Sequence, residues 1–200
     1  MLSPLERSTL LRLARQAVTL AAHDRPLSAV EVEATSPALQ SPGAAFVTLT
    51  RDGALRGCIG GLEARQPLAE DVWEHAYAAA CEDPRFEAVR PDELENLHIE
   101  VSRLGPPTPL DVPPENRLEA VRPGVDGVIL RRGVQRATFL PQVWEKVPDP
   151  LQFLEMLCDK AGLPRAAWRQ REVEMLVYQV ESFEEARRED SPSTPSETAR

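Results

Sequence analysis

The stretch from Leu55 to Gly60, with the sequence LRGCIG, forms the second half of a predicted β-hairpin. It is preceded by the apolar stretch 45–50, and Arg51-Asp52-Gly53 lies between the two. Asp-Gly is typical of a tight hairpin turn because both residues tolerate a positive φ. We therefore predict two antiparallel strands, 45–50 and 55–60, joined by this turn.

Helices and further strands are predicted on both sides of this hairpin. The stretches 36–43 and 105–114 are rich in Pro and other loop-forming residues, so we expect loops there. Because the strands follow one another as hairpins, and do not alternate with helices, the pattern predicts an α+β fold with an antiparallel sheet flanked by helices. Helices are expected at 3–22, 67–82, 91–95, 141–145, 150–161 and 164–169, and further strands at 97–104, 125–131, 135–140 and 174–180.

The composition limits the classes of protein to which the chain can belong. Its 200 residues suit one large domain or two small subdomains, and its net charge of −9 argues against a general nucleic-acid binder. Cys58, Cys81 and Cys158 are far apart and form no C-x-x-C pair, so we expect no metal or iron–sulfur site, no cofactor and reduced thiols in the cytoplasm. No run of about 18 apolar residues is present, so we expect no membrane span.

The hexapeptide contains the strongest candidate site. On a regular strand Arg56, Cys58 and Gly60 share one face, and a cation beside a thiol favours the reactive thiolate, so Cys58 and Arg56 are candidate catalytic residues. Gly57, Gly60 and Gly61 indicate a bulge or the close approach of a ligand or of another backbone segment, and they are candidate binding residues. The alternative is that Cys58 is a small buried hydrophobe and that the glycines only allow tight packing.

Other polar residues could assist such a site. Glu100 lies on the polar face of the predicted strand 97–104 and is a candidate acid or base. Arg85, in the helix-stopping segment DPRF at 83–86, could bring a cation to a pocket, but the favoured interpretation is that this segment is structural, with its aromatic residue filling the core. Asp71 and His75 lie four residues apart on a predicted helix and could bind a metal or supply a base, but a solvated helix face is the favoured interpretation.

The hexapeptide resembles the hallmark of the AMMECR domain family. Further blocks of this family occur in the same order, at 46–49, 67–71, 83–86, 99–102, 124–128, 139–144 and 160–163. They are similar to those of the bacterial and archaeal members called AmmeMemoRadiSam system protein A. The resemblance implies a two-lobed fold, with a large and a small subdomain, and a single AMMECR domain over 1–184. The polar, Ser- and Pro-rich residues 185–200 are expected to form a disordered tail.

Three functions are compatible with these residues. The resemblance implies Memo-type proteins and radical S-adenosylmethionine enzymes as partners, and we expect a partner subunit with a ligand or docking site at the hexapeptide. The alternative is a cysteine-dependent enzyme or group carrier that uses Cys58, with modification of a nucleobase or RNA as one conjecture. A weaker hypothesis is a nucleic-acid-binding module that uses the basic residues Arg131, Arg132 and Arg136.

Overall fold

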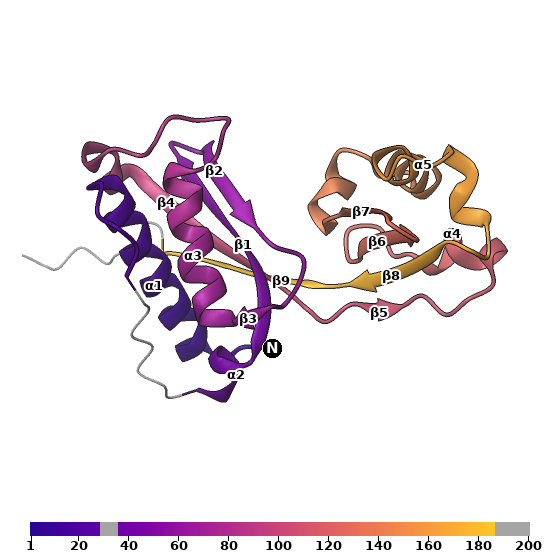
Figure 1. Cartoon of the computed structure of the whole chain (residues 1–200), viewed down its shortest axis with the longest axis horizontal. Coiled ribbons are helices and arrows are strands. Elements are labelled where there is room, and N and C mark those ends of the chain that lie inside the picture. The colour runs from indigo at the N-terminus through magenta and orange to yellow at the C-terminus, as the bar shows by residue number, and fades with distance from the viewer. Residues whose placement is uncertain (29–35, 187–200) are drawn as a thin grey trace, which may run out of the picture. The chain divides into compact units, whose positions relative to one another are not determined.

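The computed structural model describes residues 1–28 and 36–186, and it has the expected α+β fold with antiparallel sheets (Figure 1). The chain divides into two compact units, as the two-lobed expectation requires. Unit 1 comprises Met1–Ser102 together with the chain from Ser182 onward, and unit 2 is the continuous segment Arg103–Glu181. Each unit has a hydrophobic core of its own.

The sheet of unit 1 is built around the predicted hairpin. Its strands are β1 (Pro42–Arg51), β2 (Ala54–Gly60), β4 (Leu97–Leu104) and β9 (Val180–Glu184), in the order β2-β1-β4-β9, and the short β3 (Gln66–Pro67) also pairs with β1. The turn between β1 and β2 has φ values of 51° at Asp52 and 77° at Gly53, as the Asp-Gly sequence predicts.

Two helices, α1 (Pro4–Ala22) and α3 (Leu68–Cys81), lie on one side of this sheet (Figure 1). Helix α1 begins with a capping box in which Ser3 and Glu6 bond each other's backbone N–H groups. The alternate residues Ala45, Val47 and Leu49 of β1 are fully buried in the same core as the apolar faces of both helices. This face of the sheet is therefore the core face.

Unit 2 is a smaller α+β unit. Its sheet has the order β5-β8-β6-β7, formed by β5 (Thr108–Pro109), β8 (Glu174–Tyr178), β6 (Gly127–Arg132) and β7 (Gln135–Phe139). Helix α5 (Pro150–Lys160) ends before Gly162, whose φ is 69°. Short helical turns complete the described part of the unit: η2 (Pro114–Asn116), α4 (Arg117–Ala120), η3 (Pro141–Glu145) and η4 (Arg165–Arg169).

Several expectations differ from the structure in detail. The predicted strand 174–180 is divided into two strands at Gln179. The first, β8, belongs to the sheet of unit 2, and the second, β9, belongs to the sheet of unit 1. The expected loops contain a helical turn, α2 (Pro37–Gln40), and the strand β5. Helical turn η1 (Pro91–Asn96) is as expected, whereas Phe86 is only half-buried and does not fill the core.

The expected tail at 185–200 falls largely outside the described residues, which end at 186. Within the described part, Glu185 extends the contacts of β9. Its N–H donates to the carbonyl of Ile99, and its carboxylate accepts hydrogen bonds from Arg15 and from the N–H of Ile99. The chain therefore remains attached to unit 1 as far as Glu185.

Candidate functional site

The side of the unit 1 sheet that faces away from α1 and α3 carries a set of polar residues, which we call the polar face: Thr48 and Thr50 on β1, Cys58 on β2, and Glu100 and Ser102 on β4. Thr48 lies between two fully buried core residues, so its side chain points away from the helices. Cys58 is its cross-strand partner, and the Thr48 hydroxyl donates a hydrogen bond to the Cys58 Sγ over 3.4 Å. The candidate nucleophile is therefore half-buried on this polar face.

Arg56 does not lie beside Cys58 as strand alternation predicts. The pairing of β1 with β2 shifts between Leu49 and Thr50: Leu49 is opposite Gly57, but Thr50 is opposite Leu55. Arg56 is the extra residue of this β-bulge, and a bulge interrupts the alternation of side chains. Arg56 and Cys58 therefore do not form the same-face pair that regular alternation predicts, because Arg56 is the unpaired residue of the bulge.

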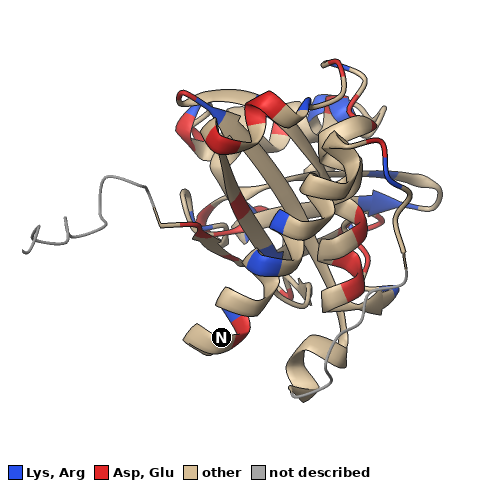
Figure 2. Cartoon of the chain, turned by 90° about the vertical axis from the view of Figure 1, so that its left-hand side faces the viewer, with Lys and Arg blue, Asp and Glu red and all other residues tan. Residues whose placement is uncertain are grey.

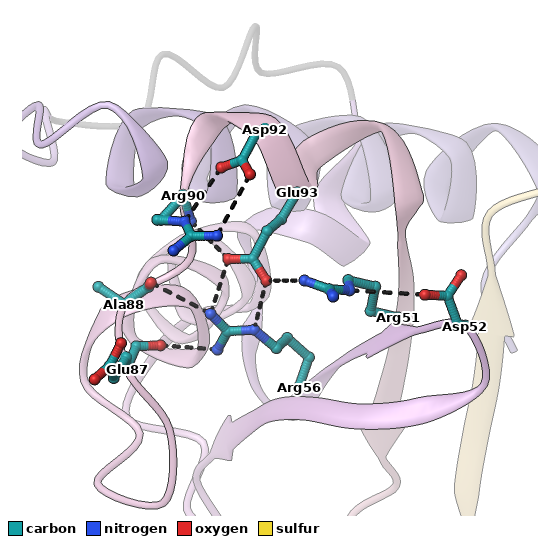
Figure 3. Close-up of polar contacts among 8 residues, drawn as sticks. All are labelled: Arg51, Asp52, Arg56, Glu87, Ala88, Arg90, Asp92 and Glu93. Atoms are coloured by element: carbon teal, nitrogen blue, oxygen red, sulfur yellow. Dashed lines mark hydrogen bonds and ion pairs between the residues drawn. The ribbon is translucent and has the colours of Figure 1, made fainter.

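The Arg56 side chain is instead bound to a buried carboxylate (Figure 3). Its Nε and Nη2 donate to the two oxygens of Glu93, over 3.0 and 2.9 Å, and Arg51 adds a third hydrogen bond of 2.6 Å. The backbone N–H of Arg90 donates to the same carboxylate. Glu93 lies on η1 and its side chain is only 5% exposed. Chiefly because of Arg56, the pKa of Glu93 is lowered to about 2.

Further N–H groups of the Arg56 guanidinium fix the segment that follows α3. Arg56 also donates to the carbonyl oxygens of Glu87 and Ala88, over 2.8 and 3.3 Å. Together these contacts hold residues 87–93 against the β1–β2 hairpin. Arg56 therefore acts as a clamp between the hairpin and this segment, and its charge is neutralised by Glu93.

Asp83 makes a second link to the hexapeptide. Its buried carboxylate accepts from the Cys58 N–H over 2.9 Å and from the backbone and guanidinium of Arg85. The hydrogen bonds from Arg85 hold the pKa of the Asp83 carboxyl well below its usual range. Arg85, one of the candidate binding residues, also donates to the Cys58 carbonyl over 3.3 Å and so contacts the backbone of the hexapeptide.

Intramolecular packing accounts for the glycines of the hexapeptide. A Cβ at Gly57 would lie 2.1 Å from the carbonyl oxygen of Ala79, so α3 can approach β2 only because position 57 has no side chain. A Cβ at Gly60 would lie 2.4 Å from the Phe46 ring. Gly61 has more space, since the nearest atom, in the His75 ring, would be 3.3 Å away. Contacts within the protein therefore explain why positions 57 and 60 are glycine, and no bound ligand is needed for that explanation.

Glu100 shares the polar face with Cys58, but β1 lies between their strands. Neighbouring strands are about 4.8 Å apart, so the backbones of β2 and β4 are separated by about 10 Å. The Ser102 hydroxyl donates to Glu100 over 3.0 Å and contacts the Ser182 hydroxyl at 2.9 Å. The structure therefore places Glu100 in a hydrogen-bonded group on β4 and β9.

Asp71 and His75 form a pair that ties α3 to the sheet. The buried Asp71 carboxylate accepts from the Ala45 N–H over 2.8 Å, and His75 Nδ1 lies 3.1 Å from the same oxygen. Residues 1–28 and 36–186 contain no group of three or more His, Cys, Asp or Glu side chains that could hold a metal ion. Over the same residues, no helix is long and apolar enough to cross a membrane.

Two basic residues of the β6–β7 hairpin, Arg131 and Arg132, have polar partners in unit 2. Arg131 pairs with Glu174 at 2.6 Å, and Arg132 donates to the side-chain oxygens of Gln170 and Gln135.

Two carboxylates that organise the site, Asp83 and Glu93, are not among the residues predicted from the sequence. The sequence pattern assigns Asp83 to a helix stop and Glu93 to a helical turn. A signal was present in the two arginines that flank the hairpin turn, Arg51 and Arg56, because two cations at one end of a hairpin need an acidic partner when they are partly buried.

Comparison with known proteins gives consistent matches along most of the chain. The family model described as AMMECR1 matches residues 11–183. A protein of Thermococcus gammatolerans is 41% identical over 187 residues, which cover 88% of each chain. Protein MK0488 of Methanopyrus kandleri is 40% identical and covers 90% of this chain and 88% of its own. The crystal structure of the uncharacterized protein PH0010 from Pyrococcus horikoshii superposes with a TM-score of 0.76 at 37% identity, and covers 88% of this chain and 89% of that one.

Proposed function

Because the chain belongs to the AMMECR1 family, we propose that it acts as a non-catalytic partner subunit whose docking site is the polar face of the unit 1 sheet along the LRGCIG strand. The partners in this proposal are a Memo-type protein and a radical S-adenosylmethionine enzyme. They are the proteins that the resemblance to AmmeMemoRadiSam system protein A implies.

The observation that carries the proposal is that the reactive-looking groups of the hexapeptide are used to build the structure. Arg56 is bound bidentately by Glu93, and Gly57 allows the close approach of α3. The Cys58 N–H is bound by Asp83, and its thiol accepts from a threonine hydroxyl, which is not a general base at neutral pH. Such an arrangement supports a rigid surface more than an activated nucleophile.

Leu55 gives this surface an apolar anchor. It is the first residue of the hexapeptide and is opposite Thr50, so it lies at the margin of the polar face, and it is 44% exposed. Full burial of an exposed leucine side chain in a complex stabilises that complex by about 1.5–3 kcal/mol. Leu55 is therefore the residue at which a docking site can be tested.

The alternative, a cysteine-dependent enzyme or carrier, has less support. A nucleophilic cysteine needs a base within hydrogen-bonding distance or a cation that stabilises its thiolate. The candidate base Glu100 is on a strand about 10 Å from β2. The candidate cation Arg56 is bound to Glu93, and Arg85, which donates to the Cys58 carbonyl, is paired with Asp83.

The test is co-purification of the tagged protein with the Memo-type protein and the radical enzyme of the same organism. We expect Leu55→Glu to abolish recovery of at least one partner, because a charge would replace the apolar anchor. Val134→Glu, at a fully exposed position of unit 2, is the matched control and should have no effect. Cys58→Ser should retain the complex. Equal recovery with Leu55→Glu and with the unchanged protein would contradict the proposal.

A further inference from the structure

Strand β9 forms an edge of the unit 1 sheet. In the sheet that the described residues form, the order β2-β1-β4-β9 leaves β9 with one neighbour, β4. The opposite edge, β2, is protected, because the Cys58 N–H donates to Asp83. An edge strand presents a row of backbone N–H and C=O groups that can pair with another strand.

A groove runs beside this edge, between β9 and the outward side of α1. Its volume is about 590 Å³, within the range of sites that bind small molecules and short peptides. The apolar part of its lining comes from Pro4 and Leu11 on α1 and from Phe183 on β9, and Arg7 and Arg12 also line it. Phe183 packs against the core of unit 1, so the groove lies on the helix-covered side of the sheet.

The charge available in this groove is positive. Its acidic residues are already engaged: Glu184 accepts from His98 Nε2 over 2.9 Å, and Glu185 is paired with Arg15. Arg12, by contrast, is exposed and makes no ion pair with any described residue. Figure 2, which looks onto the helix side of unit 1, shows basic residues recurring along the helix that begins at the N-terminus. Although the chain has a net charge of −9, this helix face is basic and therefore attracts an acidic partner.

We propose that β9 and this groove bind an extended segment of another protein, which adds a strand to the sheet edge and carries an apolar and an acidic side chain two residues apart. The surface is independent of the polar face, because the groove is on the helix side of the sheet.

The spacing follows from strand geometry. In an added strand, residues i and i+2 point to the same side of the sheet, so both enter the groove. The apolar side chain meets Leu11 and Phe183, and the acidic side chain reaches the arginines of α1. Pairing of backbone groups supplies affinity, and the alternate side chains supply specificity, as in other cases of strand addition.

The experiment uses the full chain and a fluorescein-labelled peptide, TVTLTET, in which Val, Leu and Glu lie on one side of an extended strand. Anisotropy measures its dissociation constant. A peptide with Lys in place of Glu should bind about tenfold more weakly, because one attraction becomes a repulsion. Arg12→Glu should weaken TVTLTET by a similar factor, whereas Arg171→Glu, the same change at an exposed residue of unit 2, should not.

Backbone pairing is tested by modifying the peptide, because a change in the peptide does not affect the folding of the protein. Two versions of TVTLTET are N-methylated at alternate residues, so that each blocks the N–H groups of one side of the strand. Binding should be lost with one version and kept with the other, and amide signals of Ser182, Phe183 and Glu184 should shift in NMR spectra. Equal binding of the Glu and Lys peptides, or of both methylated versions, would overturn the proposal. So would sedimentation that shows self-association abolished by Arg12→Glu, because the occupant would then be a second copy of the chain.

Discussion

At the scale of single residues, Glu93 couples the stability of unit 1 to pH. Its pKa is lowered from 4.5 to about 2 by Arg56, Arg51 and the Arg90 N–H. Because the folded-state pKa lies below the unfolded value, this stabilisation is present above about pH 4.5 and is lost as the pH falls towards 2. The difference corresponds to about 3 kcal/mol at neutral pH.

Glu93→Gln tests this coupling. The variant keeps the size of the side chain but leaves two arginines facing a neutral amide, so at pH 7 its free energy of unfolding should be about 3 kcal/mol lower. Urea titrations at several pH values should show the two proteins converging as the pH falls below 4.5. A constant difference between them down to pH 2.5 would contradict this coupling, because the contribution of Glu93 would then not depend on its charge.

The three cysteines should differ in reactivity. Burial raises the pKa of Cys81 and, in the core of unit 2, the pKa of Cys158, which lowers the fraction of each that is thiolate at neutral pH. Cys58 is half-buried and lies on the polar face. Mass spectrometry of the native protein after brief treatment with iodoacetamide should therefore find Cys58 modified first and Cys158 last. Modification of Cys158 before Cys58 would show that unit 2 opens more readily than its packing indicates.

At the scale of elements, the contact between α3 and β2 depends on one missing side chain. Gly57→Ala places a Cβ 2.1 Å from the Ala79 carbonyl oxygen, and the backbone atoms on both sides must move. We expect a loss of about 3 kcal/mol in the free energy of unfolding. Gly133→Ala is the control: it has open space around it and a φ of 58°, and should cost only about 1 kcal/mol. Equal losses in denaturant titrations would contradict the packing explanation.

The same elements show what a sequence can predict. The hairpin at 45–60, the capped helix α1 and the stop of α5 at Gly162 are predictable because each depends on a local signal, namely Asp-Gly, Ser3 with Glu6, and a glycine with positive φ. The division of 174–180 between two sheets is not, because its apolar pattern continues across Gln179. Such a division depends on which strands lie nearby in space.

The candidate site was predictable only in part. Cys58 and Glu100 share one face of the sheet, because alternation is regular from Gly57 to Gly60 and along β4. The glycines of the hexapeptide indicate that a bulge can form, but they do not say which residue is the extra one, so the loss of the same-face pair of Arg56 and Cys58 could not be predicted. The carboxylate that binds Arg56 is 37 residues away along the chain, so it belongs to tertiary structure.

At the scale of the whole molecule, unit 2 is an insertion between two neighbouring strands of unit 1. The hydroxyls of Ser102 on β4 and Ser182 on β9 are 2.9 Å apart, at the points where the chain leaves unit 1 and returns to it. We expect a chain in which an Asn-Gly turn replaces 103–181 to fold as unit 1 alone. Its circular dichroism should show a cooperative thermal transition, and amide exchange should protect β1 and β4. A molten product would show that the core of unit 1 depends on unit 2.

The position of β9 as the last strand of its sheet also has a consequence for synthesis on the ribosome. Strand β4 is made long before its partner, since the whole of unit 2 must be translated between Ser102 and Ser182. At 5–20 residues per second this takes roughly 4–16 seconds. During that time the edge of β4 is unpaired in the nascent chain and open to wrong partners, among them the same strand of a neighbouring chain on the same messenger RNA. Slow codons within unit 2 should therefore lower the yield of folded protein more than slow codons placed after β9.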